Sequence, residues 1–172
     1  MQRFLALSLL LLITSAALAT PPIYKHRLPK IVSFSVAYAK RLTANGYFKG
    51  SCLIHPKFPL RAKLYVTANT GVRLMEGEGQ YPLHLEAKKS FVVNVSGNLV
   101  DNAKLPTGVN LKLRYKLPLK SIYRYVSKTS DSPYNDEEVR KATLVYIKKL
   151  KADGNIVREQ NRCFMLDERG KP

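Results

Sequence analysis

The sequence predicts a mainly β protein, an antiparallel β-sandwich or a small barrel, with room for one short C-terminal helix near residues 136–151. Three observations favour this class. Apolar and polar side chains alternate with a period of two over short segments, as in half-buried strands. Turn-forming residues separate these segments, which recur at a spacing of roughly 8 to 12 residues.

The first two predicted strands form a hairpin. Residues 32–38 place Val, Phe, Val and Tyr on one face and Ser, Ser and Ala on the other. Asn45-Gly46 is a strong two-residue turn signal, and residues 47–54 read as the second strand. Pro56 and Pro59 end that strand, because proline cannot donate to a sheet ladder.

The middle of the chain contains four further strand segments. Residues 76–80, with two glycines, are expected to form a loop within this region. Neighbours along the chain are expected to pair, as sequential strands usually do. The expected strand bounds are 61–67, 72–75, 83–87 and 90–95.

Residues 111–117 give the clearest alternation, with three leucines and a tyrosine opposite Lys112, Arg114 and Lys116. Residues 121–126, rich in Tyr, Ile and Val, are expected to form the next strand. The polar stretch 127–135 is the longest expected loop.

The segment 136–151 supports two interpretations. Its acidic start, its lysine-rich end and the following Gly154 suit a helix. Strand-forming residues at 143–147 and the turn signal Asp153-Gly154 favour a hairpin instead. We expect the hairpin, with 144–151 paired to 155–165 and Lys148 opposite Glu159; the helix is the alternative.

The first 19 residues have the layout of a cleavable signal peptide: Arg3, an apolar core and small residues ending in Ala19. The apolar stretch is shorter than the roughly 20 residues of a spanning helix. Cleavage would leave one basic β domain, residues 20–166, with a frayed polar tail at 167–172. The protein is therefore expected in the periplasm or as a secreted protein.

Cys52 and Cys163 are the two cysteines of the chain, and in an oxidising compartment they are expected to form a disulfide. Two buried thiols are the alternative. Such a crosslink would contribute roughly 4 to 5 kcal/mol in the chain-entropy model. No metal site is predicted, because there is no Cys-x-x-Cys pair and the histidines lack ligand spacing.

Basic residues are in large excess. Removal of Arg3 with the signal peptide leaves 28 Lys or Arg against 12 acids, a formal charge of +16. Such a surface attracts anionic polymers and anionic membranes through forces that salt weakens. The alternative interpretation is that the cations only keep the surface solvated.

The most specific candidate site is the row on residues 111–117, since a strand presents alternate side chains roughly 6.5 to 7 Å apart. Following cations extend it, and two tyrosines could stack on bases or sugars. The alternative is an ordinary solvated strand, or one that discourages edge-to-edge aggregation. The candidate residues for an anionic partner are Lys112, Arg114, Lys116, Lys120, Tyr123, Arg124 and Tyr125.

No nucleophile with its base, carboxylate pair or phosphate-binding glycine loop stands out, so we expect a non-catalytic protein without a cofactor. The leading hypothesis is a binding or assembly module of the cell envelope or extracellular space, whose protein partner adds a strand to an open sheet edge. The second is an electrostatic binder of lipopolysaccharide, glycosaminoglycan or nucleic acid. The third is a small hydrolase with His55 or His84 as base.

Overall fold

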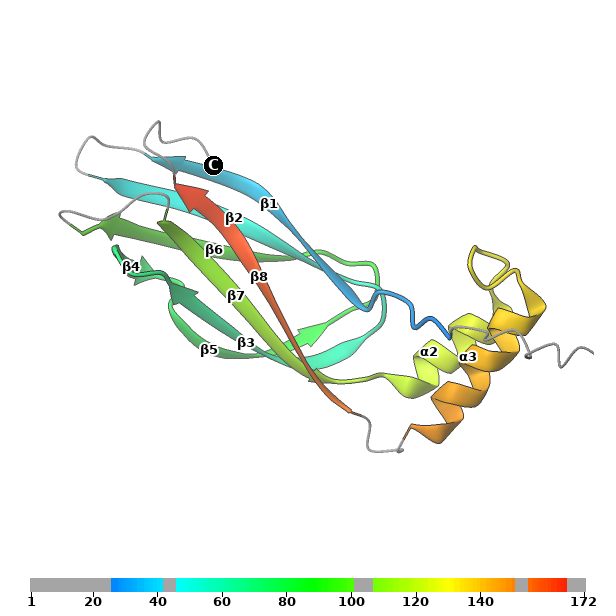
Figure 1. The fold of residues 1–172 in the computed structure, drawn as a ribbon. Coiled ribbons are helices and arrows are strands. Elements are labelled where there is room, and N and C mark those ends of the chain that lie inside the picture. Colours follow the sequence, from blue (N-terminus) through cyan, green and yellow to red (C-terminus); the bar gives the residue numbers. More distant parts are fainter. Residues whose placement is uncertain (1–25, 42–45, 101–106, 151–154, 167–172) are drawn as a thin grey trace, which may run out of the picture.

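The computed structural model describes residues 26–41, 46–100, 107–150 and 155–166. These residues form a sandwich of two antiparallel four-stranded sheets, which confirms the predicted fold class (Figure 1). Sheet A has the order β1-β2-β6-β4 and sheet B the order β5-β3-β7-β8. The strands are β1 (Val32–Arg41), β2 (Tyr47–Pro56), β3 (Leu60–Ala68), β4 (Val72–Glu76), β5 (Gly79–Leu85), β6 (Phe91–Leu99), β7 (Thr107–Lys116) and β8 (Ile156–Leu166).

The expected signal peptide, the tail at 167–172, Asn45 and the Asp153-Gly154 pair lie outside the described residues. The predicted hairpin of the first two strands is confirmed, because β1 pairs with β2 in antiparallel register. Gly46, directly before β2, has φ +82°, a conformation that glycine adopts without strain.

The core lies between the sheets and follows the predicted alternation. Leu64 and Val66 of β3 face it together with Leu111 and Leu113 of β7, and all four are buried. Removing such side chains from water is the main force that holds two sheets together.

The predicted disulfide is confirmed and lies within this core. Cys52 on β2 and Cys163 on β8 are bonded, with 5.6 Å between their Cα atoms, and both are buried. Because β2 belongs to sheet A and β8 to sheet B, the bond crosslinks the two layers of the sandwich.

The expectation that consecutive middle strands pair was wrong. β3 pairs with β5 and β7 in sheet B, whereas β4 pairs with β6 in sheet A. Alternation looks the same in either sheet, so it cannot tell which layer a strand joins. The predicted loop at 76–80 is shorter, and β5 begins at Gly79. Gly77 and Gly79 have positive φ where the chain returns to sheet B.

The strand predicted at 121–126 was also wrong, because these residues belong to helix α2 (Leu119–Lys128). Ile122 and Val126 are four residues apart, a spacing that shares a face in a helix and in a strand. In a strand Arg124 would join that buried face, whereas in the helix it points to solvent while both apolar residues are buried. The cost of burying an unpaired charge therefore favours the helix.

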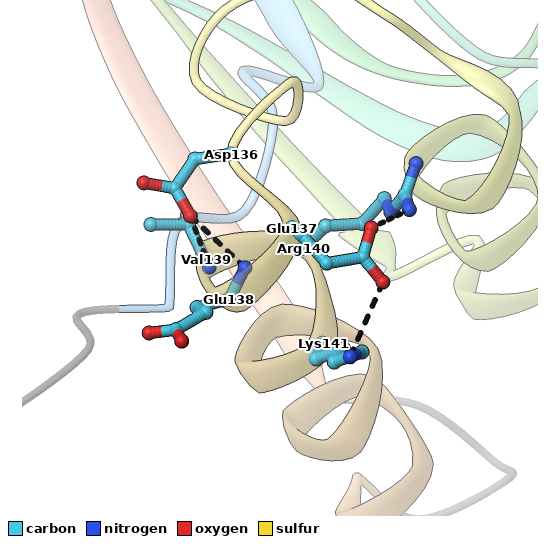
Figure 2. A network of polar contacts seen from close by, with 6 residues as sticks. All are labelled: Asp136, Glu137, Glu138, Val139, Arg140 and Lys141. Atoms are coloured by element: carbon cyan, nitrogen blue, oxygen red, sulfur yellow. Dashed lines mark hydrogen bonds and ion pairs between the residues drawn. The ribbon is translucent and has the colours of Figure 1, made fainter.

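The hairpin expected at 144–165 was wrong, and the helical alternative is correct. Helix α3 (Glu137–Lys149) begins after Asp136, whose carboxylate accepts hydrogen bonds from the backbone N–H groups of Glu138 (2.9 Å) and Val139 (3.1 Å) (Figure 2). Glu137 pairs with Lys141 at 3.3 Å and with Arg140. An N-cap and ion pairs of this kind stabilise the first turn.

β8 pairs with β7 instead, so Glu159 lies opposite Leu113 rather than opposite Lys148. The Tyr115 hydroxyl donates a hydrogen bond to the Glu159 carboxylate. Burial raises the pKa of Tyr115, and the hydrogen bond and charge of Glu159 raise it further. Tyr115 therefore stays a neutral donor, which satisfies the single carboxylate within the strands of sheet B.

The two helices lie at one end of the sandwich, between β7 and β8 in the chain (Figure 1). Tyr125 of α2 meets Phe58, from the β2–β3 loop, and Tyr134 edge to face, with ring centroids 5.6 and 6.0 Å apart. The segment before β1 contacts α3, because the Arg27 backbone N–H donates a hydrogen bond to the Thr143 hydroxyl at 3.2 Å. Within the described part of the chain, no helix has the length and apolarity needed to cross a membrane.

Candidate anion-binding face

The outer face of sheet B is strongly basic. Alternation turns one set of side chains inward, and the opposite set from β3, β7 and β8 is exposed. We call this surface the basic face, and six of its exposed residues are the cations Arg61, Lys63, Lys112, Arg114, Lys116 and Arg158.

Two rows of cations cross on this face. Lys112, Arg114 and Lys116 follow β7, as the sequence predicted. Strand pairing adds a second row, because Lys63 lies opposite Arg114 on one side and Arg158 lies opposite it on the other. Directly opposed residues have Cβ atoms roughly 4.5 to 5.5 Å apart. Arg114 therefore has four cationic neighbours, two along its own strand and two across the sheet.

No acid of the described residues neutralises this cluster. The strands of sheet B contain one acidic residue, Glu159, and its carboxylate is bonded to Tyr115 of the inward set. Glu137 at the start of α3 pairs with Arg140 and Lys141 of the same helix. The charge of the basic face is thus left for solvent ions or a ligand.

The face is hollowed at two places that share Arg114. One depression, of about 450 Å³, is bordered by Tyr65, Lys112, Arg158 and the polar side chains of Asn110 and Gln160. The other, of about 470 Å³, is bordered by Arg61, Lys63, His84 and Lys116. Arg114 lines both, so it stands at the centre of the surface. Guanidinium groups bind phosphate, sulfate and carboxylate with two parallel hydrogen bonds.

The structure places the predicted site residues on two separate surfaces. Lys112, Arg114 and Lys116 are exposed on β7, a central strand, so protection of a sheet edge does not explain them. The other four predicted residues belong to α2 instead. Tyr125 packs edge to face against Phe58. The Tyr123 ring contacts a cation, because the Lys148 ammonium lies 5.7 Å from its centre. Lys120 and Arg124 are exposed on the same helix.

Lys63, Tyr65 and Arg158 were missed as site residues. The alternation at 61–67 already places Lys63 and Tyr65 on an exposed face. Only the pairing of β3 and β8 with β7, however, brings that face beside Arg114. Tyr65 lies opposite Lys112 and therefore supplies an aromatic ring on the basic face.

Of the two histidines considered as a general base, His55 has hydrogen-bond partners that the sequence did not reveal. His55 Nε2 lies 2.7 Å from the Ser35 hydroxyl, and its Nδ1 lies 2.8 Å from the Ser90 hydroxyl. Ser35 of β1 and Ser90, directly before β6, are exposed, and His55 of β2 is partly exposed. His84 is exposed on β5 and borders the basic face. Among the described residues, no group of His, Cys, Asp or Glu is arranged to hold a metal ion.

Comparison with known proteins gives no relative from which a site could be transferred. No protein-family model matches the chain, and no curated protein matches it. The candidate site therefore rests on its own geometry and charge.

Proposed function

We propose that this protein is a non-catalytic, extracytoplasmic binding module that holds an anionic polymer against the basic face of sheet B. The observation that carries the proposal is the crossing of two cation rows at Arg114, with no acidic partner among the described residues. Like charges directly opposite on neighbouring strands destabilise a sheet. A bound polyanion removes that cost, because it places negative groups between the cations.

The extent of the face favours a polymer over a small anion. The basic face covers three adjacent strands, and both of its depressions open to solvent around one shared arginine. A chain with regularly repeated phosphate, sulfate or carboxylate groups can contact both depressions at once. Tyr65 adds a ring on which a base or sugar can stack.

Export supports the same proposal. The predicted signal peptide and the disulfide between the sheets are compatible with an oxidising compartment outside the cytoplasm. Lipopolysaccharide, glycosaminoglycan and released nucleic acid are the polyanions of such compartments that we propose as ligands.

Retention on heparin and binding of single-stranded DNA and lipopolysaccharide test the proposal. The variant Lys112→Gln/Arg114→Gln/Lys116→Gln should elute from heparin at lower salt and lose at least about tenfold in affinity for its best ligand. The matched control is Lys49→Gln/Arg73→Gln/Lys89→Gln, which removes the same charge outside sheet B. Equal losses in the two variants would mean that net charge, and not the basic face, determines binding.

A protein partner that adds a strand is the second candidate. β1 and β8 are long edge strands of their sheets, and Val36 on β1 is 45% exposed. Strand addition relies on backbone hydrogen bonds, so a complex of this kind should persist at high salt. Polyanion binding should be lost at that salt.

A hydrolase is the third candidate, favoured by the hydrogen bonds of His55 with Ser35 and Ser90. A serine nucleophile needs a base at this distance and a further group that orients the base. Hydrolysis of activated esters by the wild type, lost on Ser35→Ala and on His55→Ala, would support it. Equal rates in all three proteins would exclude this site.

A further inference from the structure

The two helices form a second surface, distinct from the basic face. A groove of about 520 Å³ runs between α2 and α3, and we call it the α2–α3 groove. Its floor consists of Leu119 and Tyr123 from α2 with Ile147 and Leu150 at the end of α3. Ile147 is buried, and the other three are partly exposed. The groove is apolar along its floor and open to solvent above.

Cations border the groove on both sides. Lys120 and Arg124 lie on its α2 side and Lys148 on its α3 side, and all three are exposed. Of the described residues that line it, none is acidic. The acids of α3 are at the opposite end of that helix, since Glu137 precedes Ile147 by ten residues, about 15 Å along the axis.

We propose that the α2–α3 groove binds an acidic amphipathic helix of a protein partner. An apolar stripe on the partner would cover the floor, and acidic residues on either side of that stripe would meet the cations of the two walls. α2 and α3 already pack against each other, and a third helix in their seam is an ordinary way to complete such a layer.

The shape of the groove decides between this occupant and a lipid. A single alkyl chain in an open groove would keep much of its apolar surface in water, whereas an amphipathic helix turns its polar face outward. A bilayer needs several apolar side chains that protrude, whereas three of the four apolar residues of the groove are only partly exposed and the fourth is buried.

The probe is a fluorescently labelled peptide of about 20 residues, with leucines at helical spacing and glutamates on both flanks of the leucine stripe. The comparison peptide has the same sequence with lysine at every glutamate position. We expect the acidic peptide to bind at least about tenfold more tightly than the basic one. The variant Lys120→Glu/Arg124→Glu/Lys148→Glu should reverse this preference, and these exposed substitutions should leave the circular dichroism spectrum unchanged.

A control separates this site from the proposed polyanion site. The variant Arg114→Gln/Arg158→Gln, altered on the basic face, should still bind the acidic peptide more tightly than the basic one, because the α2–α3 groove is unchanged. In amide NMR spectra the peptide should shift residues of α2 and α3. Shifts confined to β7, equal affinity for the two peptides, or no binding of either would overturn the proposal. Stronger competition by anionic vesicles than by unlabelled acidic peptide would overturn it in favour of a membrane surface.

Discussion

Replacing Arg114 by glutamine should stabilise the free protein. Arg114 has Lys112 and Lys116 as neighbours along β7, and Lys63 and Arg158 as neighbours across the sheet. If the charged ends of these long side chains lie about 7 Å apart in every pair, two unit charges in water repel each other by about 0.6 kcal/mol. Four such pairs give about 2 kcal/mol at low salt, where screening is weak.

Two effects reduce this gain. The flexible charged groups move apart, and the unfolded chain retains part of the repulsion, so we expect about half of it, about 1 kcal/mol at low salt. At about 0.15 M salt the Debye length of about 8 Å reduces each interaction by more than half. At about 1 M salt the gain should vanish. The result would be a protein that folds more stably while its proposed ligand binds less well.

Urea unfolding followed by circular dichroism at several salt concentrations measures this effect. Arg73→Gln is the matched control, because Arg73 is exposed on β4 and lies opposite the neutral Asn98. The control should change the free energy of unfolding by less than about 0.5 kcal/mol. A loss of stability in Arg114→Gln, or a gain that does not change with salt, would refute the argument that Arg114 is held among repelling cations.

Three further predictions concern the scaffold that presents the two surfaces. Cys52→Ala with Cys163→Ala should lower the free energy of unfolding by about 2 to 5 kcal/mol, and reductant should then have no further effect on the urea midpoint. Gly97→Ala should destabilise by about 1 to 3 kcal/mol, since a Cβ atom would clash with the Arg73 carbonyl oxygen; a midpoint equal to the wild type would contradict this close approach. Asp136→Ala should cost about 1 kcal/mol in the same assay, because it removes the N-cap of α3, whereas Asp136→Asn should retain most of the stability.

Local patterns were sufficient to predict the strands and several of their exposed residues. The alternation on β3 and β7 follows from the pleat of the backbone, so it predicted which side chains of each strand are buried. The cation row on β7 could therefore be predicted without any tertiary information. The disulfide was also predictable, because the chain has two cysteines and an expected oxidising destination.

Local patterns failed where the spacing of apolar residues fits both a helix and a strand. Ile122 and Val126 fit a strand and a helix equally well, and only the exposure of Arg124 distinguishes the two. At 136–149 the strand-forming residues suggested a hairpin, but the Asp136 cap and the packing of Thr143 and Ile147 against the rest of the protein favour the helix. The α2–α3 groove could not be predicted, because strands were expected in place of both helices.

By itself, the sequence determined that alternating segments of this chain form strands, that its two cysteines form a disulfide, and that β7 exposes a row of cations. Only the tertiary structure decided which strands share a sheet, and so which cations share a face. Lys63 and Arg158 are far from Arg114 in the chain and lie beside it because β7 is central in sheet B. Strand pairing is a long-range choice, made by the burial of whole sheets, whereas side-chain alternation is local to each strand.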